Sequence, residues 1–259
     1  IVDRLVSVFQ GGGFSCVSDD LGIRATIPQL AQTFDDMASS GEKVTLSGAV
    51  NRILEQQKAD QTKHAKNYRP QVFGAFRQGY QQLYETLAEQ SEATIHIDAF
   101  ISGVAKKPQG FVLKGAGSSF YDKILFATPA PTTAMLVKDI MPAAEAPLKA
   151  VKLASSVVVG MKFASDEGLP DNSGILVATN EPGVKAKAFT FSSKKWPHIG
   201  ARGGALVRAS FGRFGDDEIT RWEEDALVDQ ALDDLRTITG FDGRAAGLDE
   251  IYVQRWFGG

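Results

Sequence analysis

Apolar residues recur at helical spacing in the first quarter of the chain. A helix is predicted from Thr26 to Gly41, with Pro28 in its first turn. A second helix is predicted to begin near Ser47. From Gln56 to Lys66 the apolar stripe disappears, which is typical of a solvated helix or a loop.

Two more helices are predicted further along. One follows Gly79, where tyrosine and leucine residues return at helical spacing. The other runs from Glu218 to Ile238, with acidic residues in its first turn and Gly240 beyond its end. This last segment has the strongest helical pattern in the sequence.

Short runs of strand composition fill much of the remainder. Glycine, proline and asparagine separate the runs, which favours antiparallel pairing. Pro129 and Pro131 interrupt the pattern, because proline cannot donate to a β-ladder. The strand-like runs cover residues 95–104, 110–115, 120–130, 151–163, 174–179, 184–193 and 204–214.

These elements predict an α+β chain in three parts. Residues 1–67 form a helical part, and residues 68–133 form a compact α/β unit. Residues 134–259 form a mixed or antiparallel sheet with flanking helices, including a C-terminal one. The chain lacks an initiator Met and stops after a strand-like run, so we expect a piece of a longer protein.

Composition narrows the class of protein. With 259 residues, 43% hydrophobic and 23% charged, the chain resembles a globular protein, and its net charge of −3 gives no cationic field for nucleic acid. The single Cys16 excludes an internal disulfide and fits a reducing, cytoplasmic setting. No apolar run is long enough to span a bilayer and no signal peptide is visible, although peripheral membrane contact stays open.

Common catalytic patterns are absent from the sequence. No GxSxG elbow occurs, and His64, His96 and His198 sit in unrelated settings, so neither a hydrolase triad nor a metal site is predicted. The run Gly11-Gly12-Gly13 follows a strand-like segment, but Cys16 occupies the third glycine position of a dinucleotide turn. A structural glycine turn is therefore favoured, with close approach of the backbone to a ligand left open.

Charge is divided sharply in the C-terminal third. Residues 185–213 contain seven basic residues and no acid, whereas residues 216–234 contain nine acids and one arginine. The acids fit the solvated face of the helix predicted there. The basic residues, interleaved with aromatic ones, either face solvent or line a site for a flat apolar ligand that carries carboxylates.

Five segments resemble the FAD-dependent protoporphyrinogen and coproporphyrinogen oxidases, in the form found in Gram-positive bacteria. The similarity runs in register from about Val2 to Gly259. Neither the N-terminal GxGxxG unit nor the C-terminal flavin-binding segment of that family is present in the sequence. The matching segments are GGGFSCVSDDLGIRATIPQL, FRQGYQQLYETLAEQ, DKILFATPAPTTAMLV, GILVAT and LVRASFGRFGDD.

The resemblance implies a fold and a reaction. It implies that the chain is the central part of such an oxidase, with the substrate-binding domain and a middle slice of the FAD/NAD(P)-binding domain. The reaction is removal of hydride from a tetrapyrrole to FAD, repeated three times, with O₂ as the final acceptor in heme biosynthesis. The flavin does this chemistry, while the protein orients the macrocycle and excludes water.

The resemblance also implies particular site residues. Gly12, Leu176 and Phe211 match positions beside the substrate, and we expect the last two to cover opposite sides of one macrocycle. Ile101 matches a strand residue whose main chain meets adenine, and Thr128 with Pro129 matches a turn near the dinucleotide. Pairing of substrate propionates with basic residues of the 185–213 run is a separate hypothesis. No catalytic side chain is implied.

Two other classes of function stay open at this point. One is a related flavin amine oxidase or carotenoid desaturase, and the other is a non-enzymatic binder of an apolar ligand. Within the resembling family, the lack of a hydrophobic anchor favours coproporphyrinogen, the more polar substrate, over protoporphyrinogen. The isolated chain is expected to be inactive, and the sequence does not indicate its oligomeric state.

Overall fold

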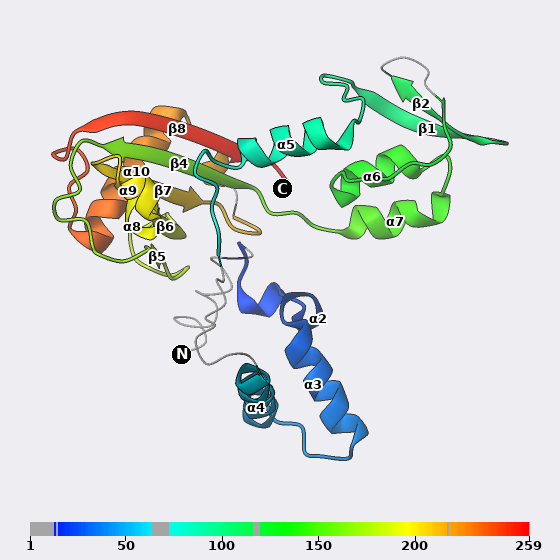
Figure 1. Ribbon diagram of the computed structural model, residues 1–259, viewed down its shortest axis with the longest axis horizontal. Helices are drawn as coiled ribbons and strands as arrows, with labels where there is room; N and C mark the ends of the chain where they lie inside the picture. The colour runs from blue at the N-terminus through cyan, green and yellow to red at the C-terminus, as the bar shows by residue number, and fades with distance from the viewer. Residues whose placement is uncertain (1–12, 14, 64–72, 116–119, 217, 259) are drawn as a thin grey trace. The chain divides into compact units, whose positions relative to one another are not determined.

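The computed structural model describes residues 13, 15–63, 73–115, 120–216 and 218–258. The chain divides into two compact units, with the boundary between Ala75 and Phe76. Gly12, predicted to lie beside the substrate, falls outside the described residues. Figure 1 labels the helices and strands.

The first unit is helical. A 3₁₀ turn, η2 (Ser18–Asp20), precedes α2 (Ile23–Thr26), α3 (Pro28–Ser39) and α4 (Leu46–Lys63). Pro28 occupies the first turn of α3, where a missing N–H leaves no helical hydrogen bond unmade. Helices α3 and α4 confirm the first two predicted helices. Their small core consists of Leu30, Met37 and Ala49, with Phe34 and Ile53 packed against it.

The second unit begins with α5 (Gln81–Ser91), which confirms the helix predicted after Gly79. Three antiparallel strands follow in the order β1-β2-β3: β1 (Ile101–Lys107), β2 (Gly110–Gly115) and β3 (Phe120–Tyr121). Two helices that the sequence did not predict come next, α6 (Ala130–Val137) and α7 (Pro142–Ala150). Helix α6 packs on β1 and contacts α7.

Two predicted strands of this region are shorter than expected. Residues 95–100 and 122–129 are not strands, although their composition favours extended structure. A strand exists through its ladder, and no strand among the described residues pairs with either segment. Composition alone therefore overestimated both strands.

The rest of the second unit is built on a five-stranded sheet, and its strands pair antiparallel, as predicted. Its order is β5-β6-β7-β4-β8, with short helices α8 and α9 between β6 and β7, and η3 and α10 between β7 and β8. The elements are β4 (Ser156–Phe163), β5 (Gly174–Leu176), β6 (Ala188–Phe191), α8 (Ser192–Lys195), α9 (Pro197–Gly200), β7 (Ala205–Phe211), η3 (Glu218–Arg221), α10 (Glu224–Thr239) and β8 (Leu248–Trp256).

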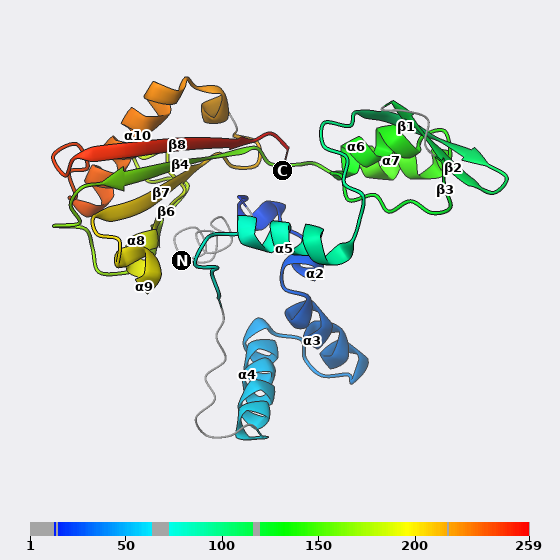
Figure 2. The ribbon, with the colours of Figure 1, turned by 45° about the horizontal axis from the view of Figure 1, so that its top comes forward.

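One face of this sheet forms the main hydrophobic core. Every second residue of β4, from Val157 to Phe163, is fully buried, and the alternate residues of β7 behave in the same way. Helix α10 lies along this face in Figures 1 and 2 and adds Leu227, Ala231 and Leu235 to the core. The helix predicted from Glu218 to Ile238 is thus confirmed, with its first turn formed by η3.

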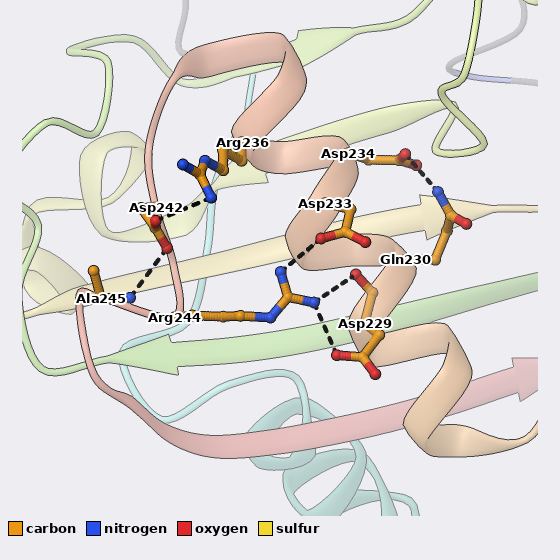
Figure 3. A network of polar contacts seen from close by, with 8 residues as sticks. All are labelled: Asp229, Gln230, Asp233, Asp234, Arg236, Asp242, Arg244 and Ala245. Carbon is orange, nitrogen blue, oxygen red and sulfur yellow. Dashed lines mark hydrogen bonds and ion pairs between the residues drawn. The ribbon is translucent and has the colours of Figure 1, made fainter.

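A polar network fixes the end of α10 to the loop that leads into β8 (Figure 3). Arg244 donates to the carboxylates of Asp233, at 2.6 Å, and Asp229, at 2.9 Å, one turn apart on the helix. Gly240 ends the helix with a φ of 78°, a conformation that favours glycine. The side chains of Arg244, Asp229 and Asp233 are well exposed, so each ion pair by itself contributes little to the free energy of unfolding.

Candidate functional site

Helix α10 packs on the core face of the five-stranded sheet, and no helix of the core cluster covers the opposite face. Strand pairing places one residue from each strand in a row across this face, because directly paired residues point to the same side. We call this face, opposite the core, the open face. Its first row, from β5 to β8, consists of Leu176, Ala188, Ser210, Val158 and Gln254.

The next row explains why the middle of the open face is shallow. It consists of Gly174, Thr190, Arg208, Gly160 and Tyr252. Gly160 has no side chain, and a Cβ built there would meet Tyr252 atoms only at ordinary contact distances, 3.6 Å and beyond. Together with Ala188, Ser210 and Thr190, this glycine leaves a floor of small residues.

Larger side chains rise at the two edges of that floor and from its centre. Leu176 on one edge strand is 39% exposed, and Tyr252 on the other edge strand is 67% exposed. Arg208 rises from the central strand β7 and is exposed. A low floor with an aliphatic side chain at one edge, an aromatic ring at the other and a cation at its centre suits a flat apolar ligand that carries negative groups.

The strand register separates the two residues predicted to cover opposite sides of a macrocycle. Leu176 shares a row with Ser210, whereas Phe211 points to the other face and is fully buried in the core beside Val157. The expectation that Leu176 and Phe211 line one cavity is therefore wrong. Ser210, the preceding residue, occupies the position on the open face.

The sequence contains a signal that could have found this. In the run from Leu206 to Phe211, apolar Val207 and Ala209 alternate with polar Arg208 and Ser210. Phe211 follows Val207 and Ala209 at the same two-residue spacing, so strict alternation along a strand places its side chain in the core with theirs. The family resemblance identified this segment, but it did not determine which face of the sheet Phe211 occupies.

Of the three residues predicted to contact the cofactor, one lies in the three-stranded sheet β1-β2-β3 and two lie in the turn that precedes α6. Ile101 begins β1, an edge strand of this sheet, and its pairing with β2 is irregular between Ile101 and Gly103. Main-chain donors and acceptors on the outer edge of β1 therefore lack a strand partner among the described residues. Such groups are able to bind the polar edge of an adenine ring.

Thr128 and Pro129 form the entry to α6. The hydroxyl groups of Thr128 and Thr133 lie 2.7 Å apart, and the Thr133 hydroxyl donates to the main-chain oxygen of Thr128. Pro129 precedes the helix, and its carbonyl accepts from the N–H of Thr133. The Thr133 hydroxyl is thus used within the turn, while Thr128 is exposed beside the N-terminus of α6, a position that favours a phosphate group.

The basic run from Lys185 to Arg213 divides between different environments. Lys187 is buried on the core side, where its ammonium donates to the Gly212 carbonyl, and burial together with nearby Arg213 lowers its pKa to about 8. Lys194 pairs with Asp166, and Lys195 lies 5.4 Å from the Trp196 ring centre. Of the seven basic residues, only Arg208 belongs to the rows of the open face.

A small cavity of about 300 Å³ lies beside the end of β7 and was not predicted from the sequence. Two residues of the basic run, Lys185 and Arg213, line its wall. Three acids, Glu181, Asp216 and Glu218, also line it, together with Trp222. The mixed charge of this wall does not select an anion.

Neither a membrane-spanning helix nor a metal centre is found in the part of the chain that the structure describes. No helix there is long and apolar enough to cross a bilayer. No group of three or more His, Cys, Asp or Glu side chains gathers there as metal ligands do.

The two sheets with their helices give the chain the fold of flavin-dependent oxidoreductases. The family model described as flavin containing amine oxidoreductase matches residues 9–257, so the chain belongs to that family. A protoporphyrinogen oxidase structure from Exiguobacterium sp. 255-15 superposes with a TM-score of 0.77 at 22% identity, covering 100% of this chain and 52% of that one. Cyclohexylamine oxidase from Brevibacterium oxydans IH-35A superposes with 0.54 at 12% identity, covering 69% and 38%.

Curated relatives align with nearly the whole of this chain. Coproporphyrinogen III oxidase of Mycobacterium leprae is 34% identical over 98% of this chain and 52% of its own length. Coproporphyrinogen III oxidase of Bacillus subtilis is 22% identical over 99% of this chain and 52% of its own. The chain thus spans about half the length of the relatives it matches.

Proposed function

We propose that this chain is the substrate-binding part of an FAD-dependent oxidase that converts coproporphyrinogen III to coproporphyrin III, with O₂ as the acceptor. The coproporphyrinogen III oxidases that match along nearly the whole chain support this substrate. FAD, when bound, supplies the two-electron oxidation. A cytoplasmic location, suggested by the single cysteine, is part of the proposal.

The open face of the five-stranded sheet is the observation that carries the proposal. Its small-residue floor gives a flat surface beside Leu176, and its central cation complements a carboxylate. The reaction needs an oriented, water-free macrocycle more than it needs an acid or base from the protein. Leu176 supplies apolar contact with one ring, while Ser210 and Ala188 leave space for the plane of the macrocycle.

Phe211 keeps no direct part in this proposal, because its ring lies in the core. Its contribution is to support the sheet from beneath. Gly12 is still proposed to lie beside the substrate, on the family resemblance alone. The cofactor roles of Ile101, Thr128 and Pro129 are proposed on the resemblance together with their main-chain and hydroxyl groups.

The test uses the full-length polypeptide that contains this chain, purified with its flavin. Coproporphyrinogen III is added under air, and porphyrin fluorescence and peroxide are followed together. We expect bound FAD, porphyrin formation and release of peroxide. Flavin-loaded protein that leaves coproporphyrinogen unchanged would refute the proposal, and faster turnover of protoporphyrinogen IX would refute the substrate assignment.

A further inference from the structure

We propose that Arg208 binds a substrate carboxylate on the open face and so gives the site its preference for a macrocycle that carries four propionates. The inference rests on the proposed function and adds a specificity residue to it. It chooses one residue from the basic run between Lys185 and Arg213. Three observations on this face support the choice.

The first observation is how the cations of the run divide among different environments. Lys187 is buried on the core side, and Lys194 is paired with Asp166. Lys185 and Arg213 line the mixed-charge cavity at the end of β7. Arg208 is the member of the run whose strand register directs it to the face that also carries Leu176.

The second observation is the charge balance around Arg208. The third row of the open face, two residues beyond Gly160 on β4, carries two other charged residues, and they neutralise each other: Lys162 donates to Glu250 at 2.8 Å. Within the described residues, Arg208 has neither an ion pair nor a hydrogen bond to its side chain. The face therefore carries one uncompensated positive charge, located on its central strand.

The third observation is spacing. Leu176 and Arg208 are two strands apart and one row apart, about 10 Å across the sheet and about 7 Å along it from the usual strand geometry. The residues between them are Ala188, Thr190 and Ser210, which rise little above the backbone. A tetrapyrrole lying on this floor against Leu176 brings a peripheral propionate within reach of the long Arg208 side chain.

Arginine suits this task better than lysine does. Its planar guanidinium donates two parallel hydrogen bonds to one carboxylate, and it stays charged at every physiological pH. Cover by an apolar macrocycle lowers the local dielectric and strengthens such a pair relative to water. A ligand whose carboxylates are esterified is neutral, so the same arginine forms no ion pair with it.

The experiment measures binding of coproporphyrin III and of its neutral tetramethyl ester to the full-length, flavin-loaded protein by fluorescence titration. Arg208→Gln is compared with Arg208→Lys and with Arg202→Gln, a matched control that removes an exposed cation from the same run. We expect Arg208→Gln to weaken coproporphyrin binding about tenfold or more and to leave ester binding unchanged. Arg208→Lys falls between, and Arg202→Gln matches the wild type.

Salt gives an independent readout. Raising ionic strength weakens binding of the tetra-acid to the wild type, and this dependence flattens in Arg208→Gln. If the wild type binds coproporphyrin and Arg208→Gln binds it equally well, the inference about Arg208 is overturned while the proposed function stands. If the flavin-loaded wild type binds no coproporphyrin, the proposed function itself fails. Should Arg208→Gln lose its flavin, Arg208→Lys provides the test: weaker coproporphyrin binding with unchanged ester binding supports the inference, and unchanged binding of both ligands overturns it.

Discussion

Leu176 and Phe211 belong to the same five-stranded sheet but point to opposite faces of it, since Leu176 aligns through Ala188 with Ser210. One side chain is 39% exposed and the other is fully buried. The two faces of the sheet therefore differ in burial. The core face supplies stability, and the open face is the one that we propose to bind the ligand.

Truncation of these two side chains therefore has different consequences. Phe211→Ala removes a fully buried ring from the core and is expected to lower the free energy of unfolding by about 3–5 kcal/mol. Leu176→Ala is expected to lower it by less than about 1 kcal/mol, because the side chain is already partly exposed. Denaturant unfolding of the full-length protein checks both values, and similar losses would contradict the assignment of faces.

Two glycines with nearly the same φ form a second matched pair. Gly212, with a φ of 84°, begins the loop after β7, and a Cβ there would lie 2.4 Å from the Ser155 carbonyl oxygen. Gly168 has a φ of 83° with nothing within 4 Å of the added Cβ. Both alanine variants carry backbone strain of about 1–3 kcal/mol. Only Gly212→Ala adds a clash, so its melting temperature should fall clearly further; equal shifts would contradict the described packing.

Asp234 predicts an unusual pH dependence. Its buried carboxylate accepts hydrogen bonds from the N–H groups of Lys185 and Ala186 and from Gln230, yet burial raises its pKa above the ordinary value. A raised carboxyl pKa means that the folded state binds the proton more tightly than the unfolded state does. This group therefore contributes stability that is lost as the pH rises from the unfolded pKa through the folded one.

Two variants separate the charge of Asp234 from its hydrogen bonds. In Asp234→Asn the side-chain oxygen still accepts from both main-chain donors, so unfolding measured from pH 4 to pH 7 should lack the Asp234 contribution while stability at neutral pH is kept. Asp234→Ala leaves the two donors unsatisfied and should cost about 1–3 kcal/mol or more. An alanine variant as stable as the asparagine variant would contradict this role.

Lys187 gives the opposite pH trend at the alkaline end. Its pKa is lowered to about 8 by burial and by Arg213, so above that pH the folded state releases a proton that the unfolded chain still holds. Stability contributed by this group rises with pH from about 8 to the unfolded pKa near 10.4. Chemical denaturation across this range should show the rise in the wild type and lose it in Lys187→Met. A rise retained in Lys187→Met would assign it to another group.

Local patterns predicted much of the fold. Pro28 and Gly41 indicated the ends of α3, and the apolar spacing of α10 matched the helix that covers the core. Helices α6 and α7 were missed because they are short and rich in alanine and proline, so neither shows a long periodic stripe. Of the strand expected at 120–130, only residues 120–121 pair as β3, because pairing partners rather than composition decide a ladder.

The candidate site was less accessible from the sequence. Family resemblance led to the segments that carry Leu176 and Phe211, but the face each occupies depends on register, and a one-residue offset reverses it. Arg208 could not be distinguished from six other cations of its run before the rows of the sheet were known. The strand pairing from β5 to β7 supplies that information.

The central claim is that the open face holds the macrocycle, and Ser210 tests it most directly. Ser210→Trp places a large ring between Leu176 and Arg208 without entering the core. Coproporphyrin III is titrated into the flavin-loaded, full-length variant and its affinity is compared with that of the wild type. We expect binding about a hundredfold weaker, with flavin content and melting temperature preserved. Wild-type affinity in Ser210→Trp would show that the ligand binds elsewhere.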